Sequence, residues 1–462
     1  DQLVVHYSGN RPGGVWKLHL DSATGPVVQT IHDGDKTGFR FRQIDFPKQS
    51  GMHDIYITYS NPNLKTMDEN GVVFDWFHFT EKFPGKDKPG FEKTYNTYWE
   101  LLQKRVPTTP IMMENPEGMR RSTQIFERGN WLVKDDEVQA DVPKSLLPLP
   151  ANARRNRLGL AMWLTDKKNP LVARTMVNRI WEQIFGNGLV ETLEDMGTQG
   201  STPSHAELLD YLSYQFMNEY NWSIKRLIKE IVLSATYRQD SKVTPELLEK
   251  DPNNKWYARG SRVRLSAEQV RDQALWISGL LSTTMKGPSV FPYQPKGIWL
   301  SPWSGKDWVI SKGDDKSRRA VYTYWKRTAA YPAMLTFDVP VREVCTSRRI
   351  RTNTPLQALV TLNDESYIEM ARAFAWLMQD NAKTAEEQIA WGYQRATYKA
   401  ASPQLVQAMM KLYNESLVHF KKDKDKTCEM VGITGKRNHP ESAAMVVVAN
   451  ALLNLDELIT KN

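Results

Sequence analysis

Cysteine is scarce in this 462-residue sequence, and its scarcity excludes several classes of protein. Cys345 and Cys428 are the only two, too few for a disulfide framework or a cysteine-based zinc site. Covalent attachment of haem c requires Cys-x-x-Cys-His, and the stretch CTSR at Cys345 lacks the second cysteine and the histidine. We therefore expect no covalently bound haem in these residues, and two buried free thiols rather than a disulfide.

Long hydrophobic runs and clustered charge are also lacking. The longest apolar run, AAMVVVANALL at residues 443–453, is far shorter than the roughly 18 residues that span a bilayer. It is typical of a buried helix, and we expect no transmembrane segment. The formal charge of +8 arises from 61 basic and 53 acidic residues that are largely interspersed. A nucleic-acid-binding protein would gather this excess on one face, so we expect no nucleic-acid partner.

Residues 1–80 have the pattern of an antiparallel β-sheet. Four stretches alternate polar and apolar residues or are continuously apolar, with turn-forming residues between them: 16–22, 39–46, 53–60 and 72–79. Ile55 and Ile57 fall on one face of their strand, as in a half-buried sheet. Because these strands are too few to close a sandwich, we expect an upstream part of the same protein to complete it.

The remaining sequence divides into a proline-rich connector with short strands, residues 81–150, and a mainly helical domain, residues 151–462. A helix is bounded by Asn169 as N-cap, Pro170 at the first helical position and Gly186 as the stop. We therefore predict an α+β multidomain protein: a partial antiparallel β-sandwich of jelly-roll type, followed by a large mainly α-helical domain.

Further helix signals make more detailed predictions. The apolar side chains that recur every four residues predict one buried stripe along the helix after Pro170: Val172, Met176, Ile180 and Ile184. Two Ser-x-x-Glu/Gln patterns predict capping boxes at later helix starts: Ser204 with Glu207, and Ser266 with Gln269.

The β region resembles the C-terminal half of a family-six carbohydrate-binding module. The resemblance rests on WKLHLDSATGPVVQT, HDIYITYSNP and VVFDWFHF, over about 80 residues. It implies a β-sandwich whose sugar cleft has an aromatic residue before the HDIY strand, and Phe39 or Phe41 matches that position. Val73 stands where the family has an asparagine, ahead of Asp75 and Trp76. Phe39 and Trp76 are thus candidate sugar-binding residues, with Trp76 in the sandwich core as the alternative.

The helical region resembles the planctomycete-type cytochrome-C-associated domain called PSD one, whose function is unknown. Three long motifs carry this resemblance: NRLGLAMWLTDKKNPLVARTMVNRIWEQIFGNG, KRLIKEIVLSATYRQ and TFDVPVREVCTSRRIRTNTPLQALVTLND, within residues 105–460. The resemblance implies an extracytoplasmic protein, in the periplasm, at the cell surface or secreted. It also implies that any haem c belongs to an upstream cytochrome segment not in this chain, and it implies no catalytic mechanism.

Three loops hold further candidates. Tryptophans among Gly, Ser and Pro either line a polymer groove or fill gaps against helices: Trp299, Trp303 and Trp308. His205 is a candidate general base oriented by Asp195, or else satisfies a neighbouring carbonyl. It is the only histidine between residues 79 and 418, which argues against a histidine metal site.

An arginine-rich stretch before a Thr-Pro helix start is the last candidate. Arg342, Arg348 and Arg349 either clamp a sulfate or uronic acid, or join an arginine–carboxylate network that fastens the loop. The local acids available to them are Asp338, Glu343, Asp364 and Glu365. Cys345 has no histidine nearby in sequence to activate it as a nucleophile.

These observations favour capture or processing of a polysaccharide, with an anionic polymer among the candidates. Two alternatives stay open: a carbohydrate-active enzyme, either an oxidoreductase or a hydrolase, and a non-catalytic surface scaffold that docks a protein partner. The functional part of this expectation rests on family resemblance, which by itself does not define a site.

Overall fold

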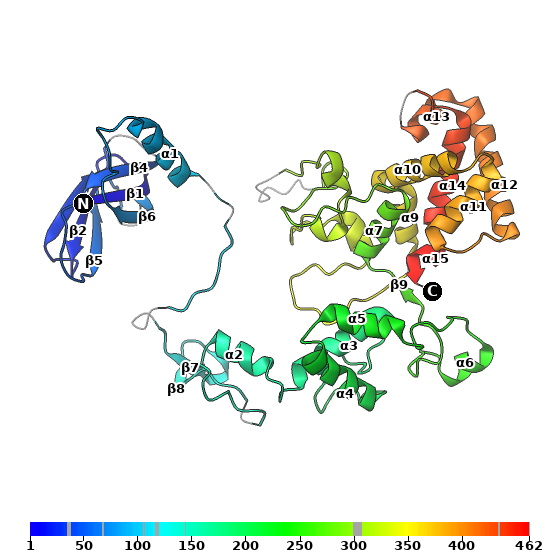
Figure 1. Ribbon diagram of the computed structural model, residues 1–462, viewed down its shortest axis with the longest axis horizontal. Coiled ribbons are helices and arrows are strands. Elements are labelled where there is room, and N and C mark those ends of the chain that lie inside the picture. The colour runs from blue at the N-terminus through cyan, green and yellow to red at the C-terminus, as the bar shows by residue number, and fades with distance from the viewer. Residues whose placement is uncertain are drawn as a thin grey trace. The chain divides into compact units, whose positions relative to one another are not determined.

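The computed structural model describes residues 1–34, 38–66, 69–104, 106, 108–115, 120–143, 145–298, 307–432 and 435–461. The chain forms two compact units, Asp1–Arg121 and Ser122–Asn462, called unit one and unit two below. Their boundary falls inside the segment for which the sequence predicts a connector. The expected α+β layout is confirmed, because unit one contains the β-sheets and unit two is mainly helical (Figure 1).

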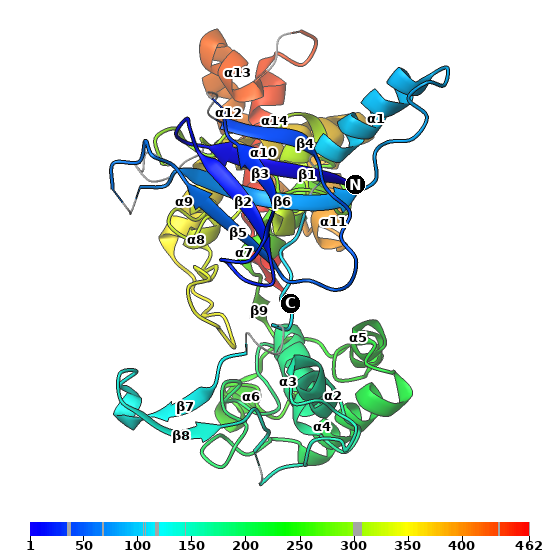
Figure 2. The same ribbon diagram turned by 90° about the vertical axis from the view of Figure 1, so that its left-hand side faces the viewer.

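Unit one is built from two three-stranded antiparallel sheets. One sheet has the order β4-β1-β6 and the other β3-β2-β5 (Figure 2). The bounds of the strands are β1 Gln2–Gly9, β2 Val15–Leu20, β3 Val27–His32, β4 Gly38–Asp45, β5 Ile55–Ser60 and β6 Val72–Thr80. The expected strands are present, and β1, which the sequence did not single out, is the central strand of its sheet.

The two sheets of unit one pack face to face over a small apolar core. Leu3, Val5 and Tyr7 of β1 lie in the same buried cluster as Trp16 and Leu18 of β2. Tyr7 meets Trp16 edge to face, with ring centroids 5.6 Å apart. Because strand residues alternate between faces, these contacts define the inner face of each sheet. Ile57 joins the core, as its position on β5 predicts.

Unit two begins with a hairpin and a first group of helices. These elements are β7 Thr123–Phe126, β8 Lys134–Val138, α2 Arg157–Leu164, α3 Leu171–Phe185, α4 Ala206–Tyr214, α5 Ile224–Leu233 and α6 Pro245–Lys250. Helix α3 ends at Gly186, whose φ of 83° suits glycine, as predicted. It begins one residue later than predicted, with Pro170 as the N-cap residue, while the Asn169 side chain accepts a hydrogen bond from Leu171 N–H.

Two detailed helix predictions need correction. The fully buried side chains of α3 include Ala173, Val177, Trp181 and Phe185, one residue further along than the predicted stripe. Met176, Ile180 and Ile184 of that stripe are partly buried and pack against the same core. The large Trp181 and Phe185 rings stack 4.3 Å apart inside the core and set this rotation of the helix. The predicted Ser204–Glu207 capping box is absent, because α4 starts after His205 and the Ser204 hydroxyl donates to the Leu189 carbonyl instead.

The second group of helices forms the larger core of unit two. Its elements are β9 Val263–Arg264, α7 Ala267–Ile277, α8 Pro332–Thr336, α9 Pro355–Asn363, α10 Glu365–Asn381, α11 Ala385–Thr397, α12 Pro403–Lys422, α13 Lys424–Val431, α14 Pro440–Leu453, α15 Asp456–Ile459 and β10 Thr460–Lys461. Helix α14 is buried on nearly every side, as its apolar sequence predicts, and α10 and α12 pack against it (Figure 1). The Ser266–Gln269 capping box at the start of α7 is confirmed.

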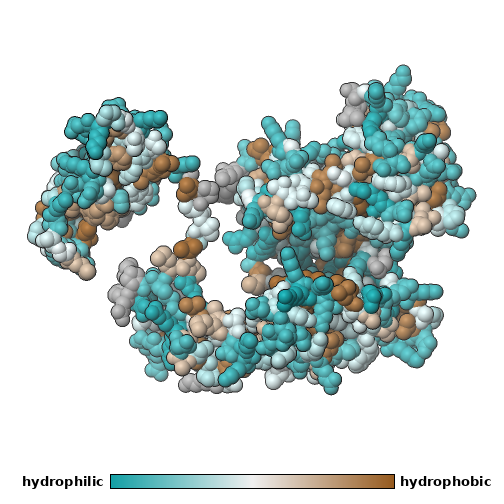
Figure 3. Space-filling model, in the orientation of Figure 1, coloured by the Kyte–Doolittle hydropathy of each residue, from teal (hydrophilic) through white to brown (hydrophobic). Residues whose placement is uncertain are grey.

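Unit two therefore has two separate cores, one around α3 and α4 and one around α10 and α14. On the face seen in Figure 3, hydrophobic residues are scattered among hydrophilic ones. Among the residues that the structure describes, no helix combines the length and the apolar composition needed to cross a membrane.

Candidate functional site

Aromatic rings gather on the outer face of the β4-β1-β6 sheet. His6 lies opposite Phe41 on β4 and opposite Trp76 on β6, and Phe39, two pairs further along, lies opposite Ser8. The His6 ring stacks against Phe41 with centroids 4.2 Å apart and against Phe39 at 5.2 Å. Trp76 stands 5.6 Å from Phe41. We call His6, Phe39, Phe41 and Trp76 the aromatic platform.

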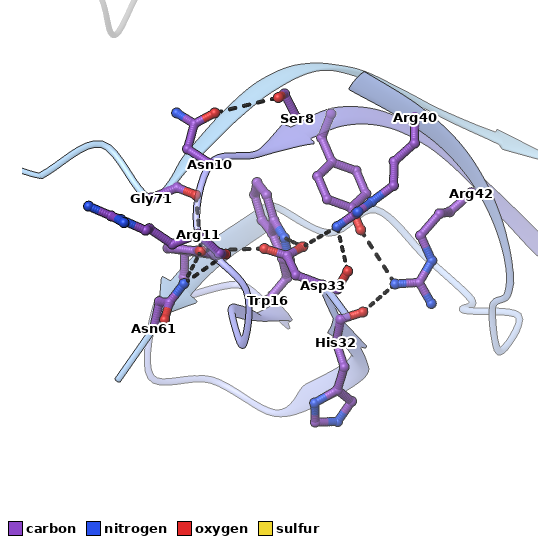
Figure 4. Close-up of polar contacts among 12 residues, drawn as sticks. Ser8, Asn10, Arg11, Trp16, His32, Asp33, Arg40, Arg42, Asn61 and Gly71 are labelled. Atoms are coloured by element: carbon purple, nitrogen blue, oxygen red, sulfur yellow. Dashed lines mark hydrogen bonds and ion pairs between the residues drawn. The ribbon is translucent and has the colours of Figure 1, made fainter. Parts of the chain in front are cut away.

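Two arginines on β4 explain why these phenylalanines face outward. Figure 4 shows Asp33 between the side chains of Trp16 and Arg40. Asp33 is buried and accepts a hydrogen bond from the Trp16 indole at 2.8 Å, while Arg40 donates to the Asp33 carbonyl. Arg42 donates to the His32 carbonyl. With Arg40 and Arg42 held on the inner side, the two-residue alternation of the strand places Phe39 and Phe41 on the outer face.

A carboxylate stands beside the platform. Asp75 accepts a hydrogen bond from the His6 ring, with 2.6 Å between Nδ1 and Oδ2. The β1–β6 register shifts between His6 and Tyr7, which pair with Trp76 and Phe74, so Asp75 is the extra residue of a β-bulge. The bulge thus brings an exposed acceptor to the edge of a ring surface.

Helix α1, Phe91–Gln103, lies beside the platform on the same face of the sheet. Tyr95 on α1 donates from its hydroxyl to Gln43 at 2.6 Å, and Gln43 pairs with the fully buried Val4 of β1. Helix α1 therefore contacts the outer face of β4 at Gln43, and the platform residues Phe41 and Phe39 follow on the same face. Phe39 remains 60% exposed.

Trp76 is thus not in the sandwich core, the alternative that the sequence left open. Its ring contacts His6 and Phe41, whereas the inner face of β6 carries Phe74 and Phe77, which line the space between the sheets. His6 could not be found from the sequence, because its place depends on β1 being the central strand.

The arginine stretch of unit two is fastened by carboxylates from other parts of the fold. We call residues 342–352 the arginine strap. Arg349 donates to Glu268 of α7 at 2.6 Å, and Arg351 lies 3.3 Å from Glu182 of α3. Arg348 stands 3.9 Å from Glu194, with both side chains about half exposed. These partners are remote in sequence, so they differ from the local acids that the sequence offered.

The contact between Arg349 and Glu268 changes the pKa of the Glu268 carboxyl. Burial acts to raise the pKa of Glu268, but the hydrogen bond from Arg349 and further contacts lower that pKa below its usual value. Arg342 behaves differently and lies over the Trp325 ring, 4.6 Å from its centroid. The structure therefore does not bring Arg342, Arg348 and Arg349 together as one clamp.

Asp338 anchors the strap from inside unit two. Its carboxylate accepts hydrogen bonds from the Thr352 N–H at 2.8 Å and the Thr352 hydroxyl at 2.7 Å. Asp338 has a φ of 59°, in the left-handed region that aspartate tolerates better than most residues. The buried Gln357 donates to the Thr336 carbonyl and accepts from Arg264. The strap is therefore held at its last residue, Thr352, and along its arginines.

The candidate tryptophan loop is only partly described. Trp299 and Trp303 lie outside the described residues. Trp308 donates from its indole to the Pro292 carbonyl at 2.7 Å and stacks 5.9 Å from Tyr331 against the larger core. Trp308 thus fills a gap against the helices, one of the two roles that the sequence allowed.

Asp195 and His205 each have their own local partners. Asp195 accepts the N–H of Gly197 at 2.7 Å, and the His205 Nδ1 lies 3.0 Å from the Ser204 hydroxyl. The His205 ring packs near Trp256 and Tyr257. Across the described ranges, no hydrogen bond or ion pair links Asp195 to His205, so the structure does not assemble them as an acid–base pair.

The described residues contain neither a candidate metal site nor a disulfide. Among them, no group of three histidine, cysteine, aspartate or glutamate side chains is arranged to hold a metal ion. Cys345 and Cys428 are both free thiols. The expectation that both are buried is wrong: Cys345 is exposed on the strap, and Cys428 is half-buried.

A β-sheet unit followed by a helical unit with two cores defines an α+β protein of at least two domains. The chain belongs to the family PSD1, described as "Protein of unknown function (DUF1553)", whose model matches residues 156–413. This match lies within unit two, and the carbohydrate-module resemblance of unit one has no such match. No curated protein and no solved structure matched the chain.

Proposed function

We propose that this protein captures polysaccharide outside the cytoplasm, and that the aromatic platform of unit one is its binding surface. The observation that carries the proposal is the set of outward-facing rings, with Phe39 more than half exposed and Asp75 at the edge. Sugars are bound by aromatic faces that pack on their C–H surfaces, with a few polar groups that fix their hydroxyls. The platform supplies both kinds of group.

The resemblance to family-six carbohydrate-binding modules supports the same proposal from the sequence. Val73, which replaces the asparagine of the family's cleft, pairs with Ser8, and Ser8 also pairs with Phe39. Val73 therefore lies on the same face of the sheet as the platform, and the proposed binding relies on the rings and Asp75 in place of that asparagine.

Stacking, rather than charge, is the proposed source of affinity. The strap arginines Arg348, Arg349 and Arg351 each have a carboxylate partner, so their charge is already balanced. Retention on a neutral polymer should therefore persist at high salt, because salt screens exposed charges but not ring stacking.

The test is a pull-down of the full chain on a panel of neutral, sulfated and uronic polysaccharides across a salt series. We expect salt-resistant retention on at least one neutral polymer and loss of retention in the double variant Phe39→Ala/Trp76→Ala. Tyr56→Ala is the matched control, because Tyr56 is an exposed aromatic residue on the other sheet. Retention only on acidic polymers, or equal retention of both variants, would refute the platform. Release of products from the bound polymer would instead indicate an enzyme.

A further inference from the structure

A cavity in the larger core of unit two is lined by a buried arginine to which the described residues supply no carboxylate partner. The cavity has a volume of about 210 Å³, several times the space that one water molecule needs and enough for a small organic ligand. Its lining comes from α7, α10 and the segments around residues 280, 293, 310 and 316. Arg271 of α7 forms part of this wall and is only 5% exposed.

Arg271 is poorly satisfied by the protein. A guanidinium has five N–H donors, and that of Arg271 makes one hydrogen bond, from Nη2 to the Lys316 carbonyl at 2.9 Å. Its Nε is buried without a hydrogen-bond partner among the described residues. None of the ion pairs within 4.0 Å among the described residues includes Arg271. Burying such a charge is costly unless an anion balances it.

The acidic side chains around the cavity already have other partners. Glu369 pairs with Lys316, and Glu365 pairs with Arg372 at 2.9 Å. Asp364 caps helix α10 by accepting the Ser366 N–H at 2.9 Å, and Asp272 accepts the Ala320 N–H at 2.6 Å. Among the described residues, Arg271 therefore has no carboxylate in direct contact, and Asp364 acts on it only without an ion pair.

The rest of the lining narrows the chemistry of a ligand. Four apolar side chains line the cavity: Leu275, Leu280, Ile310 and Met370. A planar guanidinium suits the two oxygens of a carboxylate. The nearby Glu365 and Glu369 disfavour a doubly charged anion such as phosphate, because like charges repel. We propose that this cavity binds a small organic monocarboxylate, with its carboxylate on Arg271 and its apolar body against the aliphatic wall. This site is independent of the proposed glycan platform.

Calorimetric titration of the full chain with hexanoate and with 1-hexanol tests the charge and the apolar body separately. We expect saturable binding of hexanoate, and binding of 1-hexanol weaker by about tenfold or more, because a charge-assisted hydrogen bond is lost. Arg271→Gln should weaken hexanoate binding by about tenfold. Arg437→Gln is the matched control, since Arg437 pairs with Asp380 away from this cavity and its loss changes the net charge equally. Equal binding of the two probes, no saturable binding of hexanoate, or unchanged binding by Arg271→Gln would overturn the site.

A measurement on the unmodified protein covers the case in which Arg271→Gln fails to fold. Methyl NMR of the methionines should show a shift of Met370, which lines the cavity, on addition of hexanoate. Met378, on the same helix and fully buried elsewhere in the core, should not move. No shift of Met370, or equal shifts of both methyl groups, would count against the proposal.

Discussion

The platform of unit one and the strap of unit two contain side chains typical of binding sites, but the two regions use them differently. Phe39 on the platform is 60% exposed, and His6, Phe41 and Trp76 beside it are half-buried. On the strap, Arg351 faces Glu182, whose side chain is 7% exposed. Rings on an open sheet face remain available to a ligand, whereas guanidinium groups matched by carboxylates are not. Partners, rather than residue type, therefore distinguish a binding surface from scaffold.

Removing a strap counter-ion should have the largest effect on stability. Glu182→Gln leaves the charge of Arg351 uncompensated in a largely buried place, and we expect a loss of about 3 kcal/mol in unfolding free energy. Urea unfolding followed by circular dichroism measures the loss. The double variant Glu182→Gln/Arg351→Met should recover part of it, because no lone charge remains.

Glu194→Gln is the control for this prediction. The ion pair of Glu194 with Arg348 is about half exposed on both sides, so we expect a change within about 0.5 kcal/mol. Equal losses in Glu182→Gln and Glu194→Gln would contradict the view that the strap is held by buried pairs.

The acidic anchor of the strap should have the next largest effect. Asp338→Ala removes the acceptor of both Thr352 hydrogen bonds and places alanine at a φ of 59°, so we expect a loss of about 2 kcal/mol. Asp338→Asn keeps an acceptor and tolerates this φ, so its loss should be smaller. If the two variants melt at the same temperature, the anchor contributes little.

The sequence was informative wherever the signal was local. Alternation identified β5, and Gly186 and the Ser266–Gln269 pair marked helix ends that the structure contains. The same kind of pattern failed at Ser204, because a tertiary contact to the Leu189 carbonyl competed with the cap. Local signals hold where nothing distant offers the side chain a better partner.

The candidate sites depended on contacts between distant residues, which one sequence does not reveal. Phe39 and Trp76 were found through a family resemblance, but their neighbour His6 required the pairing of β1 with both β4 and β6. Glu268 and Glu182, the partners of Arg349 and Arg351, lie some 80 to 170 residues away in sequence, on helices that the sequence predicted without their packing. That Arg271 is buried without an ion-pair partner among the described residues likewise becomes visible only in the folded core.

A smaller effect on stability is expected at Asp364, a half-buried carboxylate that forms no ion pair with the residues that the structure describes. Burial raises the pKa of Asp364 above its usual value, although its cap hydrogen bonds and Arg271 act to lower it. The folded protein therefore binds this proton more tightly than the unfolded chain, and stability is lost as pH rises through the interval between the two pKa values. Asp364→Asn keeps an N-cap acceptor and removes the charge.

We expect Asp364→Asn to melt slightly higher than the parent protein at neutral pH, and the difference to shrink in acid, where the aspartate is protonated. Melting temperatures at neutral pH and near about pH 3 measure this difference. A lower melting temperature of Asp364→Asn at neutral pH would mean that attraction to Arg271 outweighs the cost of burial.

The most direct test of the central claim is the affinity of the full chain for an oligosaccharide derived from the best-retained neutral polymer. The account predicts that Trp76→Ala weakens binding by about tenfold, since an aromatic stacking partner is lost. It also predicts that Tyr56→Ala binds like the parent protein and that both variants remain folded. Equal affinities for the parent protein and Trp76→Ala would contradict the claim that the platform binds the sugar.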